Sequence, residues 1–315
     1  MKYFREYPFG MQILLFLLMA FTMWVATVFL FYLLTRLSGF TLDQVQNISA
    51  SSPMALINTA VVAQGLGNAF MYLLPAALFA YLAHPKPMGY LGLRAPGKNL
   101  QFVLVILVML GAMPVLTWIE ELISHIDFGA KIKASQAQND NMMKAFLRMP
   151  DAATFLRALL VMALVPALGE ELLFRGVLLR MAKKRSAGMT IPIIFSAIIF
   201  SYAHTNIYGY LSIFLAGVLL AVVYYLTGSL WCSIVAHMFF NGTQIVLAYM
   251  SNSNPALKKL NESTAMPAYL VVAGAVLFGI SFYLLLKNKT PLPRNWTDDF
   301  SGEKRTEFDF EEKME

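Results

Sequence analysis

The chain has 315 residues, of which 58% are hydrophobic and only 13% are charged. Because a soluble domain usually carries about 25% charged residues, this composition excludes an ordinary soluble globular protein. The net charge of +6 does not indicate nucleic-acid binding, since the Lys and Arg residues lie mainly in short segments between apolar runs. The single cysteine, Cys232, excludes an internal disulfide bond.

The apolar residues gather into runs of about 20, the length that a helix needs to cross a hydrocarbon layer of about 30 Å. We therefore predict an all-α fold, a polytopic transmembrane helical bundle of about eight spans. The predicted spans cover residues 9–35, 55–83, 100–119, 156–179, 189–207, 209–227, 229–250 and 267–286.

Three features qualify this series of spans. The first run is longer than the core of a signal peptide and lacks a small-residue cleavage site, so we interpret it as a retained span. The second contains Pro75 and is expected to be kinked or tilted. The fifth and sixth are nearly continuous, and only residues 206–209 suggest a break between them.

Lys and Arg residues predict the orientation of the bundle. They gather before the first span, between the second and third, after the fourth and after the eighth, and eight spans place these four groups on one side. By the positive-inside rule that side is cytoplasmic, and both termini lie on it. Lys258, Lys259 and the mixed-charge loop 120–154 depart from the pattern.

The segments outside the spans carry weaker signals. In the loop 120–154, a polar stretch from Lys131 to Asn141 is followed by residues 142–148. These seven residues have the pattern of a short amphipathic helix on the outer surface, or belong to a solvated linker. The tail after residue 290 is rich in charges of both signs and is predicted to be disordered.

Few ionisable side chains lie well inside the spans, where such groups are costly and usually paired or functional. They are Glu170, Glu171 and Arg175 in the fourth span, His204 in the fifth and His237 in the seventh. At about 1.5 Å per residue, Glu170, His204 and His237 lie roughly 20, 22 and 12 Å from the cytoplasmic side. They can converge near the middle of the membrane if these three helices pack together.

Three pairs have the i, i+4 spacing that places side chains on one face of a helix: Glu171 with Arg175, Phe200 with His204, and His237 with Asn241. The first pair can form an ion pair within its own helix. Glu170 is turned by about 100° from Glu171 and can face a different neighbour.

Three motifs give the sequence a specific resemblance. Residues 170–175 read EELLFR, residues 200–204 read FSYAH and residues 237–241 read HMFFN. In this order, and each in a different apolar span, they resemble the EExxxR, FxxxH and HxxxN motifs of the CPBP family of intramembrane proteases (CAAX proteases and bacteriocin-processing proteins, also called Abi). The resemblance covers residues 155–245, and the segment 90–94, YLGLR, is similar to a common feature upstream.

The resemblance implies a role for each motif. Glu170 with His204 would act as the base that activates a water, and His237 with Asn241 would stabilise the oxyanion. These residue types suit that chemistry, because a carboxylate can take a proton from water while amide and imidazole N–H groups can donate to a developing negative charge. The supporting, mainly structural residues would be Glu171, Arg175 and Phe200.

It also implies a domain organisation and an environment. Residues 1–99 hold the first two spans and a cytoplasmic loop, 100–154 the third span and an external loop, 155–250 the CPBP-like catalytic core, 251–290 the last span and 291–315 a polar cytoplasmic tail. The protein would be a multi-pass enzyme of the cell membrane, of the bacterial inner-membrane type. Its partners would be a membrane peptide or protein substrate and the lipid bilayer, with no nucleic acid.

Two alternatives stand beside this interpretation. Glu170, His204 and His237 could bind zinc, as a glutamate and two histidines do in other peptidases, although no HExxH motif is present. The protein could also be a non-catalytic Abi-type protein that serves in bacteriocin self-immunity or as a scaffold. A transporter is less well supported, because no internal repeat is visible.

Overall fold

The computed structural model describes residues 3–261, 265–293 and 295–298, and within these ranges all regular structure is helical, as predicted. Seven helical segments are long and apolar enough to cross a membrane. They are α1 (Phe9–Leu37), α3 to α4 (Met54–Ala83), α6 (Leu100–Ser124), α8 to α10 (Ala152–Lys184), α12 (Tyr210–Thr227), α13 (Leu230–Ser251) and α15 (Ala268–Lys287).

The eighth apolar helix, α11 (Thr190–Ala203), is shorter than the expected span 189–207. It ends at Ala203, and the chain turns back into α12 after residues 204–209, where the sequence suggested only a short break. At about 1.5 Å per residue α11 is roughly 21 Å long, so it reaches only part of the way across a bilayer. His204 therefore lies at the tip of a helical hairpin.

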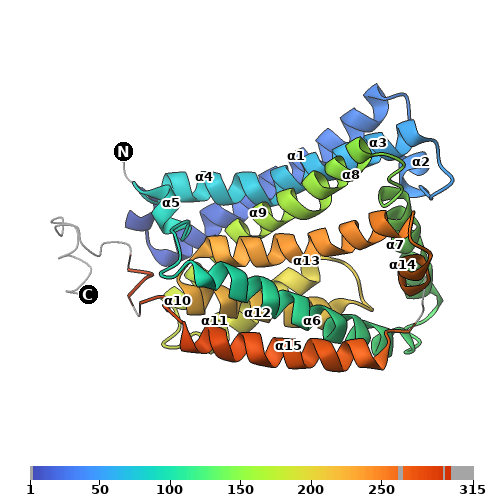
Figure 1. Ribbon diagram of the computed structural model, residues 1–315. Helices are drawn as coiled ribbons and strands as arrows, with labels where there is room; N and C mark the ends of the chain where they lie inside the picture. The colour runs from blue at the N-terminus through green and yellow to red at the C-terminus, as the bar shows by residue number, and fades with distance from the viewer. Residues whose placement is uncertain (1–2, 262–264, 294, 299–315) are drawn as a thin grey trace, which may run out of the picture.

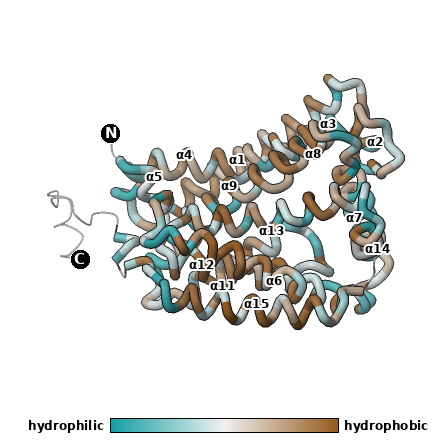
Figure 2. Tube along the Cα trace, in the orientation of Figure 1, coloured by the Kyte–Doolittle hydropathy of each residue, from teal (hydrophilic) through white to brown (hydrophobic). Residues whose placement is uncertain are grey.

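The spans lie roughly parallel and form one bundle (Figure 1). In that view α1, α4 and α9 form its upper part, while α6, α12 and α15 form its lower part, with α13 between the two. Hydrophobic residues dominate the length of the spans, and hydrophilic residues gather at both ends of the bundle (Figure 2). The first and last described residues lie at the same end of the bundle.

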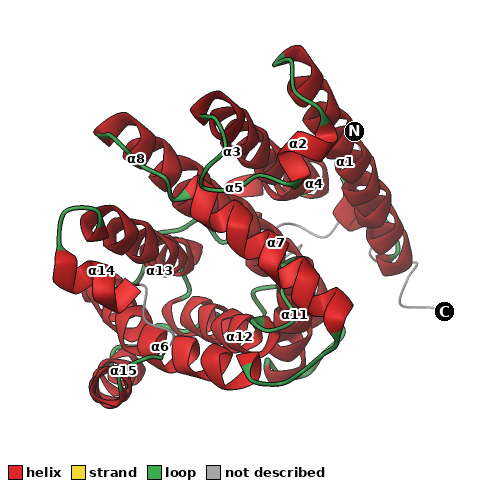
Figure 3. Cartoon of the chain, turned by 90° about the vertical axis from the view of Figure 1, so that its right-hand side faces the viewer, coloured by secondary structure: helices red, strands yellow, loops and turns green. Residues whose placement is uncertain are grey.

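Short helices occupy the two ends. α5 (Pro87–Tyr90) lies at the end that carries the termini, whereas α2 (Leu42–Gln46), α7 (Ala130–Phe146) and α14 (Pro255–Asn261) lie at the opposite end. α7 runs across that opposite end of the bundle (Figure 3). α7 also includes the polar stretch from Lys131 to Asn141, so the short helix predicted over 142–148 is the end of a longer helix that stops at Phe146.

The prediction of disorder after residue 290 is wrong for the residues that directly follow α15. Thr290 N donates to Leu226 O at 2.8 Å, Leu292 N donates to Tyr225 O at 3.0 Å, and Trp296 is buried. This short segment packs against the end of α12 because its apolar side chains and backbone groups find partners there. Residues 299–315 lie outside the described part of the chain.

Close backbone contacts hold the bundle together. A Cβ atom on Gly111 of α6 would lie 2.4 Å from Phe278 N of α15, and one on Gly274 of α15 would lie 2.8 Å from Gly111 O. Small residues allow two membrane helices to approach in this way, and their packing replaces the hydrophobic driving force that lipid does not provide.

The YLGLR segment fixes the start of α13. Gly92 O accepts a hydrogen bond from Leu230 N at 2.9 Å, and Arg94 O accepts one from Ser229 Oγ at 2.6 Å. Gly92 has φ +79, and a Cβ atom there would meet the hydroxyl of Tyr224 at 2.1 Å, so this position requires glycine. The segment thus positions the helix that carries His237.

Candidate active site

The fourth span is not a regular α-helix. It starts as α8 (Ala152–Ala158), continues as the π-helical segment η3 (Leu159–Leu164), and then forms α9 (Val165–Glu171), a second π-helical segment η4 (Leu172–Leu178) and α10 (Leu179–Lys184). η3 lies directly before Pro166, whose ring cannot fit into a regular helix beside the carbonyl four residues earlier. Such π segments are frequent at functional sites.

The second span has the same feature, with the π-helical segment η2 (Ala69–Leu73) directly before Pro75. The kink or tilt expected of this span stays a prediction. η2 packs against the fourth span beside the two glutamates, since a Cβ atom on Gly169 would lie 3.1 Å from both Leu73 N and Tyr72 Cβ. A glycine directly before Glu170 thus lets these two spans touch.

Glu171 is fully buried and has three partners. Its Oε1 accepts hydrogen bonds from Arg175 Nη1 at 2.7 Å and from His237 Nδ1 at 2.9 Å, while its Oε2 accepts one from Ser233 Oγ at 2.6 Å. The ion pair expected from the i, i+4 spacing is therefore present. Three partners satisfy the carboxylate, as a buried charge requires.

Arg175 is also fully buried. Its Nη2 donates to Gly217 O of α12 at 3.0 Å, and its guanidinium group lies 4.4 Å from the centre of the Phe200 ring. Arg175 thus links the fourth span to both helices of the hairpin, which agrees with the supporting role predicted for it.

The contact with Glu171 sets the orientation of the His237 ring. Because a carboxylate only accepts hydrogen bonds, His237 Nδ1 carries a proton and Nε2 is directed away from Glu171. His237 Nε2 lies 3.9 Å from Glu170 Oε2. Glu171 therefore positions a ring of the candidate site in addition to pairing with Arg175, a contact between two helices that the spacing within one helix could not predict.

His204 is oriented by a different acceptor. Its Nδ1 lies 2.8 Å from Phe200 O, and a carbonyl oxygen can only accept, so Nδ1 carries a proton. In a neutral ring, the lone pair on Nε2 then faces Glu170 Oε2 at 3.7 Å. Phe200 thus holds His204 through its backbone, and its ring lies 4.7 Å from the His204 ring and 5.9 Å from the His237 ring.

Glu170 lies where the two imidazoles meet. The exposed fraction of its side chain is 8%, that of His237 is 6% and that of His204 is 31%. Its buried Oε2 has no hydrogen-bond partner among the described residues. Glu170, His204 and His237, which the sequence singled out, are therefore close in space. Solvent or substrate can reach them most easily beside His204, whose side chain is the most exposed of the three.

Asn241 is half-buried and lies one turn beyond His237 on α13. Its side chain makes no hydrogen bond to another residue in the described ranges, so its predicted role with His237 stays a prediction. Ser233 and Gly217, which contact Glu171 and Arg175, carry no motif signal and were missed by sequence reasoning.

Glu170 Oε2 lies farther from His204 Nε2 and from His237 Nε2 than two ligand atoms of one zinc ion lie from each other. Ligand atoms of a tetrahedral zinc site are about 3.3 Å apart when the metal bonds measure about 2.0 Å, whereas the separations here are 3.7 and 3.9 Å. Among the described residues, no group of three or more His, Cys, Asp or Glu side chains has an arrangement that could hold a metal ion. The zinc interpretation therefore stays an untested prediction, and no step below depends on it.

An apolar groove of about 590 Å³ runs beside the candidate site, between α8 with η3 on one side and α13 on the other. Met238, Phe239 and Gly242 line it from α13, and Met238 and Gly242 directly follow His237 and Asn241 in the sequence. Leu156 and Leu160 on the opposite wall are exposed, so the groove opens toward the lipid. The other lining residues are Leu159, Ala163, Leu164, Thr243, Val246 and Leu247.

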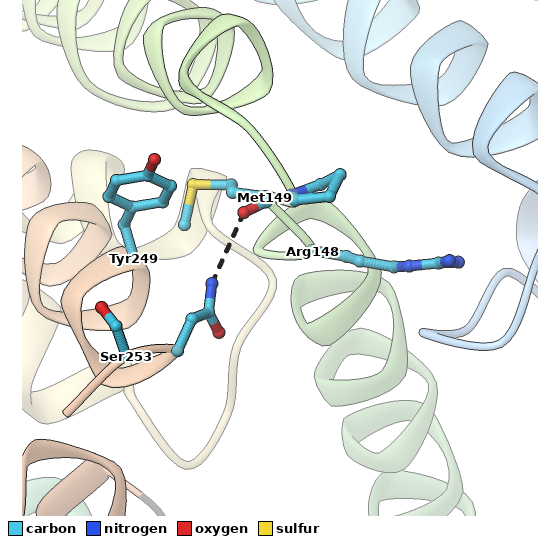
Figure 4. A pocket seen from close by; sticks show the side chains of 6 residues that line it. Arg148, Met149, Tyr249 and Ser253 are labelled. Atoms are coloured by element: carbon cyan, nitrogen blue, oxygen red, sulfur yellow. Dashed lines mark hydrogen bonds between the residues drawn. The ribbon is translucent and has the colours of Figure 1, made fainter. Parts of the chain in front are cut away.

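A second cavity of about 400 Å³ lies between the far end of α13 and the link from α7 to α8 (Figure 4). Asn252 donates to Met149 O across it at 3.4 Å. Arg148, its one charged lining residue, points away and donates to the carbonyl oxygens of Ala50 and Ser52. This cavity lacks the acids and histidines of the first site.

Comparison with known proteins agrees with the motifs. Residues 152–243 match the family model described as type II CAAX prenyl endopeptidase Rce1-like, and the match contains all three motifs. No curated protein and no solved structure matches the chain. The predicted resemblance to the CPBP family is thereby confirmed for this segment.

Proposed function

We propose that the protein is an intramembrane endopeptidase in which Glu170 activates a water molecule for attack on a peptide bond. The observation that carries this proposal is the placement of the buried Glu170 Oε2, which lies 3.7 and 3.9 Å from two imidazole nitrogens. These separations are too long for direct hydrogen bonds, so Glu170 Oε2 keeps its capacity to accept a proton from a water.

In the proposed reaction, the water donates hydrogen bonds to Glu170 Oε2 and to the lone pair of His204 Nε2. Glu170 accepts a proton as the water oxygen bonds to the substrate carbonyl carbon. When the tetrahedral intermediate collapses, the C–N bond breaks and Glu170 returns the proton to the leaving amine. The products are a carboxylic acid and an amine, which together contain the atoms of the peptide and of one water.

The oxyanion would be stabilised from α13. His237 donates from Nδ1 to the Glu171 carboxylate at 2.9 Å, which directs its Nε2 edge toward Glu170. An imidazole that also carries a proton on Nε2 can donate to the oxyanion, and the amide of Asn241 would add a further donor. Such preformed donors typically contribute about 10²–10³ in kcat.

The apolar groove would hold an isoprenoid chain on the substrate next to the scissile bond. Two features support this occupant: Met238 and Gly242, which line the groove, directly follow His237 and Asn241 on α13, and the matched family is named for prenyl endopeptidases. The chain would leave the membrane lipid for the groove while the peptide bond reaches Glu170.

Filling this groove tests the proposal. Gly242→Leu should raise KM for a prenylated peptide by about tenfold or more, as expected from losing several buried CH₂ contacts, and leave kcat nearly unchanged. Gly279→Leu on α15, where a Cβ atom meets nothing within 4 Å, is the matched control. Steady-state kinetics on prenylated peptides measures the effect, and an unchanged KM in Gly242→Leu would show that the chain binds elsewhere.

Treatment with a chelator tests whether the reaction depends on a bound metal ion. Because Glu170 and the two histidines act directly on water here, a strong chelator that is then removed should leave kcat and KM unchanged. Metal content and turnover are measured on the same sample. Activity that is lost with zinc and returns with added zinc would instead make Glu170, His204 and His237 metal ligands.

A further inference from the structure

The turn at the tip of the α11–α12 hairpin, residues 204–209, is partly covered by the bundle, and Tyr208 and Gly209 in it are buried. Backbone groups inside a membrane need internal partners, and a non-helical turn there depends on the protein around it. Thr205 has φ +50, a left-handed conformation that a β-branched residue rarely adopts. Such a residue persists only when surrounding contacts hold it in place.

Two contacts from the third span and the link that follows it hold this turn. Glu120 Oε1 on α6 accepts a hydrogen bond from Asn206 Nδ2 at 3.3 Å, and Asn206 Oδ1 accepts one from Gly209 N at 3.0 Å. The Phe128 ring, after α6, packs edge-on against Tyr208 at 5.3 Å. The carboxylate of Glu120 thus reaches the turn through the side chain that closes it.

Glu120 escaped sequence reasoning because the third span was expected to end at residue 119. α6 continues to Ser124, so Glu120 and Glu121 lie within its last turns. Each bonds to a different segment: Glu120 to the hairpin turn, and Glu121 to Met266 N at 2.8 Å, just before α15. The adjacent glutamate therefore makes a comparable hydrogen bond that has no connection with the candidate site.

His204 is the first residue of the turn. Its ring is held by Phe200 O on one side and faces Glu170 on the other. A shift of the turn would move the imidazole away from Glu170 without touching Glu170 or His237. A misplacement of about 1 Å in a catalytic group can reduce turnover by roughly 10²-fold.

We propose that Glu120 is a positioning residue, which holds the turn through Asn206 and thereby holds His204 against Glu170. This rests on the proposed function. Glu120 lies outside the matched segment 152–243, so the site depends on a span that the family model does not include. Its role is that of a hydrogen-bond acceptor, which glutamine can also fill.

The test compares Glu120→Ala, Glu120→Gln and Asn206→Ala with Glu121→Ala as the matched control. Two experiments are made on the full-length protein. Steady-state kinetics gives kcat and KM on a prenylated peptide, and hydrogen–deuterium exchange follows the backbone amides of residues 204–210. Glu120→Ala and Asn206→Ala should each lower kcat by about tenfold to hundredfold, leave KM nearly unchanged and speed exchange in the turn. The double variant Glu120→Ala/Asn206→Ala should have the same kcat as Asn206→Ala alone. Glu120→Gln and Glu121→Ala should keep wild-type kcat and wild-type exchange.

The outcomes separate this inference from the proposed function. Wild-type kcat in Glu120→Ala would overturn the inference alone, and so would a Glu120→Gln variant as impaired as Glu120→Ala, since Glu120 would then act as an acid or base. If the wild-type protein has no turnover, the proposed function fails. The exchange measurement still tests the inference in that case. Unchanged exchange of the turn in Glu120→Ala would show that Glu120 does not hold the turn.

Discussion

Replacing Glu170 by glutamine should abolish proteolysis while the protein inserts into membranes and purifies normally. Glutamine keeps the shape of the side chain but cannot take a proton from water. The turnover number should therefore fall by about 10²–10⁴-fold or more, since a general base typically contributes that much. Stability should be unchanged or slightly higher, because the buried Oε2 has no hydrogen-bond partner among the described residues. Turnover and melting temperature measured on one preparation test both statements.

The control for this variant is Glu6→Gln, the same change at an exposed position far from the site. It should leave both turnover and melting temperature unaltered. A Glu170→Gln variant with wild-type turnover would remove Glu170 from the role of base. In that case the position of its carboxylate between two imidazoles would need another explanation.

Loss of Glu171 should have a different signature, dominated by stability. Glu171→Gln leaves the buried Arg175 without its anionic partner, and breaking a buried ion pair typically costs about 3–5 kcal/mol. Arg175→Ala should be destabilised to a similar extent, because Glu171 then keeps a buried charge. Both variants should show a lower melting temperature in detergent.

Turnover separates the two partners of this ion pair. Glu171→Gln should lose more activity than its folded fraction explains, because His237 Nδ1 also loses its carboxylate. Arg175→Ala should lose activity in proportion to folding. If Glu171→Gln is fully stable and inactive while Glu170→Gln remains active, the roles of the two glutamates are exchanged.

The sequence predicted the helical class, most span positions and the residues that meet at the site. Each of these follows from a local pattern: the length of an apolar run, or an ionisable group where lipid would surround it. Glu170, His204 and His237 were singled out because charge within a span is costly, and the fold brings them together.

Features that depend on contacts between helices could not be predicted in this way. The hydrogen bond from His237 to Glu171 joins residues of two spans that lie 66 positions apart in the sequence, and no spacing rule within one helix reveals it. The same holds for Glu120, whose partner Asn206 lies 86 positions away. The π-helical turns before Pro75 and Pro166 adjust which faces meet, and the sequence shows only that a proline is present.

Two polar segments have more structure than their sequence indicated. The polar stretch 131–141, for which no helix was predicted, forms most of α7. The residues after α15 fold back because Leu292 and Trp296 are apolar enough to be buried within an otherwise charged tail.

The most direct test of the central claim is mass spectrometry of a prenylated peptide incubated with the purified protein in lipid vesicles. The wild-type protein should produce two fragments whose masses add up to the peptide plus one water, and Glu170→Gln should produce neither. Wild-type protein that is folded in the vesicles but leaves the peptide intact, or a Glu170→Gln variant that cleaves it equally well, would contradict the account.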